Sequence, residues 1–244
     1  MSAKSIIVTA IVIILVIMLI KYIASDVNTL TGLTAADTVQ KIDATALASG
    51  ENASSSNYSY SIWFYIDDWN YKYGKQKAIF GRMSKDTDTK QPCPIVYLGR
   101  EQNNLEIVSS VYPGDTTTGV ATDEQMVVNT CSVSNVPIQK WVNLIISAYG
   151  RTMDVYLDGK LVRTCVLPGV SNIDSNASVY VTPNGGFSGW TSKFQYWSES
   201  CNPQKAWNIY KQGYGGSWLG NMLGKYTVKI SLMEGDVEDK SFVL

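Results

Sequence analysis

The sequence contains no histidine, and this absence excludes several classes of chemistry. A Ser-His or Cys-His catalytic pair cannot form, and imidazole cannot serve as a metal ligand. Cysteine is scarce as well. The four cysteines are Cys93, Cys131, Cys165 and Cys201, and none is spaced as CxxC, so the sequence does not predict a thiolate zinc site.

An excess of charge is also missing. The net charge is −1 over 244 residues, and there is no long basic run. Proteins that bind nucleic acid by electrostatics carry a basic surface, so we do not expect a nucleic-acid partner. Aromatic residues are plentiful instead. Seven Trp and fifteen Tyr, together with many Thr and Val, favour sheet over helix.

One long apolar run is present near the N-terminus. Residues 5–20 are uncharged and almost wholly aliphatic, and the apolar stretch continues past Lys21 to Ala24. About twenty helical residues span roughly 30 Å, which is the thickness of the bilayer hydrocarbon. We therefore predict a single-pass transmembrane anchor over residues 1–24, with the span between Ile6 and Ala24. The alternative is a secretory signal peptide, but no small-x-small cleavage site follows the run. Lys4 and Lys21 flank the uncharged run of residues 5–20 evenly, so the membrane orientation stays open.

Residues 25–57 are rich in Ala, Thr, Ser and Asp and poor in large apolar residues. This composition is typical of a spacer, which would separate the folded part from the bilayer. A short helix could form within the spacer between Thr34 and Leu47.

The clearest strand pattern lies between Trp141 and Leu167. Residues 141–148 are nearly continuously apolar, which is typical of a strand buried on both faces. Residues 153–158 alternate apolar and polar, and Asp158-Gly159 supplies a tight hairpin turn before the return strand at 161–167. The stretch therefore predicts three consecutive antiparallel strands.

Shorter β-type runs surround these three strands. We predict further strands at 58–66, 77–82, 94–98, 105–111, 125–133, 177–182 and 188–197, and one helix at 203–210. Many short strands and one late helix favour an all-β fold of two stacked antiparallel sheets, a jelly-roll sandwich over residues 58–213. Residues 214–244 form a C-terminal tail with one added strand at 226–233. The tail is either an edge strand with a loose terminus or a docking arm for a neighbouring subunit.

Two of the cysteines flank the central strands. Cys131 precedes them and Cys165 lies on the last one, so neighbouring strands could bring the two thiols together. We predict a Cys131–Cys165 disulfide; the alternative is two buried free thiols. A Cys93–Cys201 pair has little support.

Several segments together resemble the laminin G-like, concanavalin A-like jelly-roll superfamily. These segments are YSYSIWFYI, KWVNLIISAYG, DVYLDGK, FSGW and the closing helix up to Gly213. The wording VPIQKWVN, RTMDVYLDGKLVRTCVLPGV and TPNGGFSG is similar to membrane-anchored members from large double-stranded DNA viruses of eukaryotes. The resemblance implies a virion component, a minor capsid protein that links the capsid proteins to the underlying membrane. Such viruses often encode thiol oxidases, so the resemblance is compatible with a disulfide.

One carboxylate pattern suggests an enzyme. Glu234, Asp236 and Glu238 are spaced so that one strand would present all three on the same face, as in β-glucanases built on this sandwich. The triplet lies close to the C-terminus and outside the resembling region, and no aromatic cleft can be traced around it. We therefore predict no enzyme activity.

Ligand binding is the remaining question. Loop acids could hold calcium, but they follow no EF-hand series and are expected to be solvated, so no cofactor is predicted. These acids are Asp67, Asp68, Asp86, Asp88 and Asp115. Aromatic residues that could stack on a glycan are Trp69, Tyr71, Tyr73 and Trp190, with Trp69 and Trp190 preferred. Trp63 and Trp141 are assigned to the core. The sequence thus favours a structural membrane protein of the virion, and the alternative is a membrane-anchored lectin.

Overall fold

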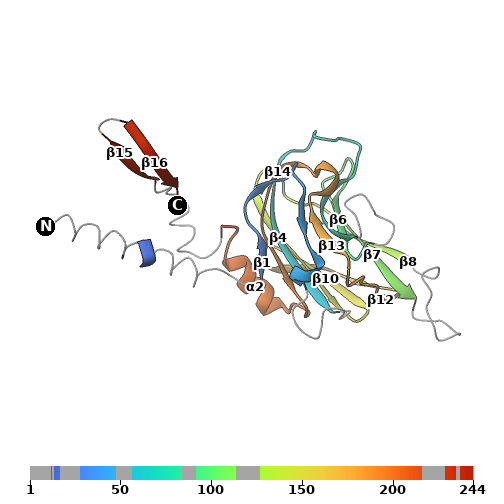
Figure 1. Cartoon of the computed structure of the whole chain (residues 1–244). Helices are drawn as coiled ribbons and strands as arrows, with labels where there is room; N and C mark the ends of the chain where they lie inside the picture. Colours follow the sequence, from blue (N-terminus) through green and yellow to red (C-terminus); the bar gives the residue numbers. More distant parts are fainter. Residues whose placement is uncertain are drawn as a thin grey trace. The chain divides into compact units, whose positions relative to one another are not determined.

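The computed structural model describes residues 12, 14–16, 28–47, 57–83, 92–113, 127–215, 229–234 and 237–243. Within these ranges the chain divides into two units, and the larger one, residues 28–214, is a sandwich of two antiparallel sheets (Figure 1). The first sheet has the strand order β1-β14-β4-β9-β10-β11, and β2 also pairs with β14. Its strands are β1 (Thr29–Thr31), β2 (Thr34–Ala35), β4 (Tyr58–Asp68), β9 (Trp141–Tyr149), β10 (Thr152–Leu157), β11 (Lys160–Val166) and β14 (Ser188–Trp197).

The second sheet has the order β12-β7-β6-β5-β13-β3, and β8 also pairs with β7. Its strands are β3 (Gln40–Ile42), β5 (Lys77–Met83), β6 (Ile95–Leu98), β7 (Leu105–Pro113), β8 (Val127–Val133), β12 (Gly169–Ser171) and β13 (Ser178–Val181). The described part of this unit also contains the short 3₁₀ helices η1 (Ala44–Leu47) and η4 (Pro183–Gly185) and the helix α2 (Pro203–Lys211). The predicted all-β, two-sheet antiparallel sandwich is confirmed, and strands lie at each range predicted between 58 and 197.

Alternating side chains of β4 show how the core forms. Tyr58, Tyr60, Ile62, Phe64 and Ile66 are at most 1% exposed, and all five belong to the cluster between the two sheets. Because successive side chains of a strand point to opposite faces, the residues between them lie on the outer face of the first sheet. Trp63 is one of these. It is buried as predicted, but it packs outside the sheet and not between the sheets.

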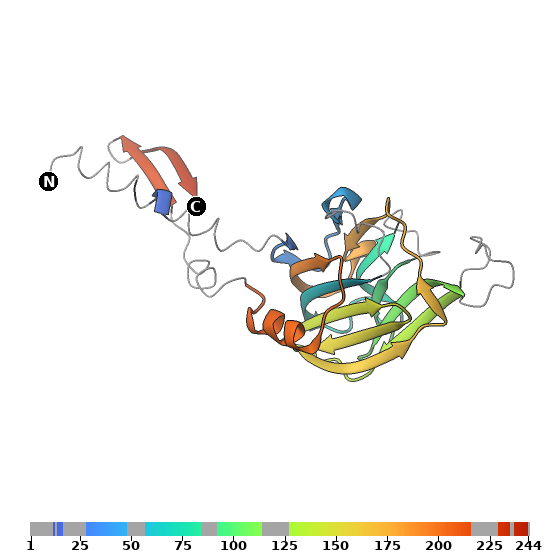
Figure 2. The ribbon, with the colours of Figure 1, turned by 90° about the horizontal axis from the view of Figure 1, so that it is seen from below.

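Helix α2 covers part of that outer face. Ala206 and Ile209 pack against Ile145 of β9 and Tyr156 of β10 in a second, smaller apolar cluster. The helix begins as the sequence predicts, since Asn202 accepts a hydrogen bond from the Lys205 N–H at 2.8 Å and Pro203 follows it. Figure 2 shows the helix lying against the outside of the sandwich.

The Asp158-Gly159 turn fits closely under this helix. Gly159 has a φ of +73°, and a Cβ built on it would lie 2.9 Å from the Tyr210 Cβ. Glycine is therefore required at this position for two reasons: the turn has a left-handed backbone conformation here, and the helix approaches closely.

The predicted spacer over residues 25–57 is wrong for residues 28–47. Strand β1 pairs with β14, β2 also pairs with β14, and β3 pairs with β13. The helix predicted between Thr34 and Leu47 is also wrong, because this stretch forms β2, β3 and η1. Its few apolar side chains suffice because the sheets supply the partners: Ala36 and Leu47 are at most 1% exposed in the core.

Most of the predicted membrane span lies outside the described residues. Val12, Ile14, Leu15 and Val16 are helical. Among the residues that the structure describes, no helix is long and apolar enough to cross a membrane.

The C-terminal tail contains a hairpin of β15 (Lys229–Glu234) and β16 (Val237–Val243), which pair with each other. The described part of the tail thus has two strands, whereas one was predicted. Glu234 ends β15 and Glu238 lies on β16, so they belong to different strands, and Asp236 lies outside the described residues. The prediction that the acidic triplet could share one strand is therefore wrong.

A disulfide joins the two sheets. Cys131 of β8 and Cys165 of β11 are bonded, with their Cα atoms 6.0 Å apart, as the sequence predicted. Strand β11 is the last strand of the first sheet, and β8 pairs with β7 of the second. Cys93 and Cys201 are both buried and free. The bond therefore connects the sheets at one edge of the sandwich.

Candidate functional site

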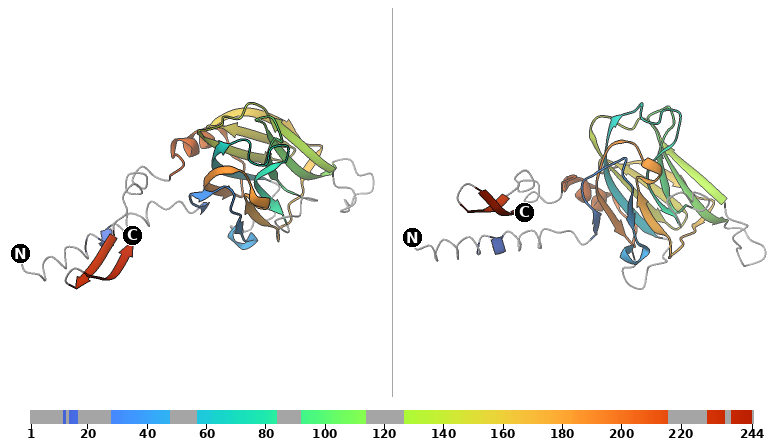
Figure 3. Two further views of the ribbon diagram at one scale, coloured as in Figure 1. Left: turned by 90° about the horizontal axis from the view of Figure 1, so that it is seen from above. Right: turned by 45° about the horizontal axis from the view of Figure 1, so that its top comes forward.

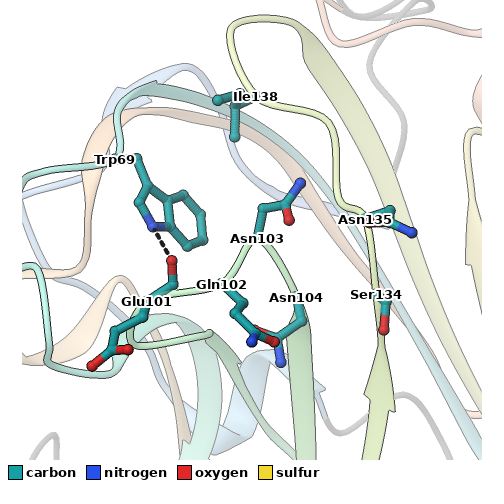
Figure 4. A pocket seen from close by; sticks show the side chains of 8 residues that line it. All are labelled: Trp69, Glu101, Gln102, Asn103, Asn104, Ser134, Asn135 and Ile138. Atoms are coloured by element: carbon teal, nitrogen blue, oxygen red, sulfur yellow. Dashed lines mark hydrogen bonds between the residues drawn. The ribbon is translucent and has the colours of Figure 1, made fainter.

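The first candidate site is a pocket of about 450 Å³ beside Trp69, called here the Trp69 pocket. Three loops form it: the segment after β4, the β6–β7 loop and the β8–β9 loop (Figure 4). Its lining residues are Trp69, Glu101, Gln102, Asn103, Asn104, Ser134, Asn135 and Ile138. The pocket thus lies where neighbouring strands of both sheets end.

The Trp69 ring is held from two directions. Its Nε1 donates a hydrogen bond to the Glu101 carbonyl oxygen at 3.1 Å (Figure 4). The Lys77 Nζ lies 4.4 Å from the ring centroid, within the range of a cation–π interaction. Lys77 is only 1% exposed, and burial lowers the pKa of its ammonium. These contacts fix the orientation of the indole.

The two remaining loops are joined to each other. The Asn103 carbonyl accepts a hydrogen bond from the Val136 N–H at 2.8 Å, and the Asn103 Nδ2 donates to the Val136 carbonyl at 3.2 Å. Asn135 has a φ of 60°, a left-handed conformation that asparagine adopts more readily than most residues. The two loops are therefore fixed to one another by one backbone and one side-chain hydrogen bond.

Gly99 allows the β6–β7 loop to turn tightly. Its N–H donates to the Asn104 carbonyl at 2.9 Å, and a Cβ at this position would lie 1.7 Å from Asn104 Oδ1. Any other residue at position 99 would displace the Asn104 side chain from the pocket wall.

The chemistry of the pocket suits a ligand with many hydroxyl groups. Four side-chain amides, one hydroxyl and one carboxylate provide both donors and acceptors, and the indole offers an apolar surface. Glu101 is the one acidic residue among the eight lining residues. Glycoside hydrolysis commonly uses two carboxyl groups that flank the glycosidic bond, whereas these lining residues contain a single carboxyl group.

The second candidate site is a groove of about 370 Å³ on the outer face of the first sheet, called here the aromatic groove. Its lining residues are Leu33, Tyr65, Trp141, Trp190 and Tyr214. Trp190 of β14 is directly opposite Tyr65 of β4, which is opposite Trp141 of β9. Cross-strand aromatic neighbours of this kind stabilise a sheet, and here they form a continuous row.

Tyr214 completes the row from the end of the sandwich. Its ring stacks on Trp141 with a centroid distance of 4.4 Å and an interplanar angle of 8°. Trp141 was assigned to the core, and that prediction is wrong, because the residue lies half-buried on the outer face beyond the cover of α2. The alternation of β9 carries Trp141 to that face, whereas Val142 and Leu144 point into the core.

The structure places the two predicted glycan contacts in different settings. Trp69 lies among amides, but Trp190, 41% exposed, lies among aromatic rings and Leu33. The other two aromatic candidates lie outside both linings. Tyr71 donates to the Gly185 carbonyl at 2.9 Å, and Tyr73 is 59% exposed.

The sequence reasoning missed the polar half of the Trp69 pocket. The signal was present in the loop sequence EQNN at 101–104 and in Ser134-Asn135, but only the fold brings these loops beside Trp69.

The predicted loop acids do not form a cation site among the described residues. Asp67 and Asp68 are exposed, and Asp68 Oδ1 accepts a hydrogen bond from the Asn70 N–H. Asp86, Asp88 and Asp115 lie outside the described ranges. In the part of the chain that the structure describes, no cluster of three or more acidic or thiol side chains could hold a metal ion.

The fold is of a lectin-like type. The family model of the concanavalin A-like lectin/glucanases superfamily matches residues 40–205, which is more than half of the chain. The chain therefore belongs to this superfamily, as its resemblance implied. No curated protein matches the chain.

Solved structures with a similar fold include binding domains of botulinum neurotoxins. The receptor binding domain of the C/D mosaic serotype is 12% identical with a TM-score of 0.51, over 75% of this chain and 46% of that one. The serotype G binding domain is 12% identical with a TM-score of 0.45, over 64% of this chain and 36% of that one. The chain thus spans less than half the length of these structures, and the similarity to the C/D mosaic domain, at 12% identity, shows the fold alone.

Proposed function

We propose that the protein is a non-enzymatic interaction protein, anchored to a membrane through residues 6–24, whose sandwich binds a partner without transforming it. The partner that the geometry supports best is a glycan in the Trp69 pocket. One observation carries this proposal. The Trp69 indole, held by its hydrogen bond to Glu101, lies beside four side-chain amides in a pocket of a concanavalin A-like sandwich. An aromatic face that stacks on a sugar ring and amides that bond its hydroxyls are complementary interactions. The proposal requires no cofactor.

A glycan array probed with the full chain in detergent tests this proposal. We expect saturable binding to one class of glycan and its loss in Trp69→Ala. Trp207→Ala is the matched control, since Trp207 is 39% exposed on α2 and lies outside the pocket lining. Binding that survives Trp69→Ala, or an array without any saturable signal, contradicts the glycan proposal.

A second candidate function is a structural one, that of a minor capsid protein linking the capsid shell of a virion to the underlying membrane. Its support is the resemblance of segments within residues 136–189 to membrane-anchored viral sandwich proteins, together with an exposed aromatic groove that a protein partner could cover. Cross-linking of assembled particles tests it. We expect cross-links between exposed lysines of the sandwich, such as Lys41 and Lys160, and capsid proteins. Their absence from purified particles that contain the chain contradicts this role.

The anchor has its own test. We expect the full chain to float with lipid vesicles in a density gradient, and a chain lacking residues 1–24 to remain in the soluble fraction. A full chain that does not float contradicts the anchor.

A further inference from the structure

The aromatic groove is an apolar surface that the proposed glycan binding leaves unused. Leu33 is 65% exposed, Tyr214 44% and Trp190 41%, although all three lie next to one another at the groove. Large apolar side chains that stay half-exposed in a contiguous patch mark a surface that a membrane or a protein partner covers.

The positions of the two ends of the sandwich indicate what covers the groove. The Asn28 carbonyl accepts a hydrogen bond from the Tyr196 N–H, and the Tyr214 carbonyl accepts one from Ser192 Oγ. Both ends of the sandwich therefore lie against β14, the strand that carries Trp190. Figure 3 shows β1 and α2 on the same side of the sandwich.

The sequence then limits how far this side can be from a bilayer. The predicted span ends at Ala24, and Asn28 is four residues later. Four residues reach at most about 14 Å when fully extended. A membrane crossed by residues 6–24 therefore lies within that distance of Asn28, and Leu33 follows five residues after Asn28, between β1 and β2.

The composition of the groove matches the interfacial region of a bilayer. Trp and Tyr concentrate at this depth because one end of each ring is apolar and the other carries an N–H or O–H that stays hydrated. The groove contains two of each, with one exposed leucine at its edge. None of the five lining residues carries a charge that the headgroup layer would have to desolvate.

We infer that the aromatic groove docks on the bilayer interface, with Leu33, Trp190 and Tyr214 in contact with the lipid, so that the sandwich has a fixed face toward the membrane. This inference rests on the proposed membrane anchor. The docking contact adds to the anchor and does not replace it, because three part-exposed side chains bury too little apolar area for stable binding by themselves.

A fluorescent label at the groove tests the inference in the full chain. Leu33→Cys carries an NBD label in vesicles made with lipids brominated near the headgroup. Leu161→Cys is the matched control, since Leu161 is 50% exposed on β11, at the far edge of the first sheet. The native cysteines do not compete for the label, because two are bonded to each other and two are buried. We expect about threefold more quenching at position 33 than at position 161, since the interfacial layer is only a few ångströms thick.

Flotation of the same samples separates the two ideas. A chain that does not float overturns the anchor and the docking together. A chain that floats with equal quenching at both positions overturns the docking alone. A label at position 33 that shifts to the blue without quenching shows that a second copy or another protein covers the groove, which also overturns the lipid contact. Adding Trp190→Ser to Leu33→Cys should reduce the quenching, whereas adding Trp207→Ser should not.

Discussion

Two ionisable side chains lie buried beneath α2. The Tyr156 hydroxyl donates to the Cys201 carbonyl at 3.3 Å, and burial raises the pKa of Tyr156 from 10.0 to about 12 and that of Cys201 from 9.0 to about 11. The folded state therefore favours the protonated forms. The stability that these groups contribute is fully present below pH 9 and is lost as the pH rises through the folded pKa values.

We predict a corresponding loss of stability in alkali. For Cys201 the shift of about two pKa units corresponds to about 2–3 kcal/mol of unfolding free energy, lost between pH 9 and pH 11. Urea unfolding over this range measures it. Cys201→Ala should flatten the profile below pH 10 and retain the later loss due to Tyr156. An unchanged profile in this variant would assign the alkaline loss to other groups.

At the scale of residues, the sequence identified one exposed tryptophan of each candidate site. Trp69 and Trp190 were predicted as exposed aromatics, and both line a cavity. Trp141 was assigned to the core because it opens the most apolar strand, and the pattern could not show that α2 ends before covering it. The amides of the Trp69 pocket were not predicted either, because residues 101–104 and 134–135 meet only through long-range strand pairing.

The two turns that flank β10 allow two glycine effects to be separated, because Gly150 lies between β9 and β10 and Gly159 lies between β10 and β11. Gly150 and Gly159 both have positive φ, +53° and +73°, but a Cβ at Gly150 meets nothing within 4 Å, whereas at Gly159 it meets Tyr210 and Trp207. We predict that Gly150→Ala costs about 1 kcal/mol of unfolding free energy and that Gly159→Ala costs about 3 kcal/mol, because only the second displaces the helix. If thermal unfolding showed the same loss of unfolding free energy for both variants, α2 would be able to move away from position 159 without a cost in stability.

The Cys131–Cys165 bond offers a second test at the scale of elements. The bond closes a loop of 34 residues in sequence separation. In the chain-entropy description such a loop stabilises the folded state by about 4 kcal/mol. We predict that reduction lowers the unfolding free energy by this amount. A double variant with Cys131→Ala and Cys165→Ala should be equally weakened and insensitive to reductant; a variant that still responds to reductant would place the redox effect elsewhere.

Strands with strong alternation or clear turns were predicted within a few residues, and the early strands were not. The reason is physical: β4 and β10 carry their own apolar pattern, but β1, β2 and β3 are two or three residues long and are defined by the strands beside them. Composition alone cannot distinguish such short strands from a linker.

At the scale of the whole molecule, we predict that the minimal folding unit begins at residue 28. Ile42 and Leu47 are at most 7% exposed in the core, and truncations of such side chains cost about 2–5 kcal/mol each. Because domains are stable by only about 5–15 kcal/mol, a fragment of residues 58–214 should not unfold cooperatively, whereas residues 28–214 should. Urea unfolding followed by near-ultraviolet circular dichroism distinguishes them. Equal cooperativity would show that β1, β2 and β3 are dispensable.

The attachment of both ends of the sandwich to β14 has a mechanical consequence. A pull exerted between the two ends is applied near Tyr196, where β1 begins, and near Ser192, where the chain leaves. The force is therefore transmitted through β14 and the strands paired with it, and it does not act on the disulfide between β8 and β11. Under tension, the short β1 pairing should rupture first, while the body that carries the Trp69 pocket keeps its shape.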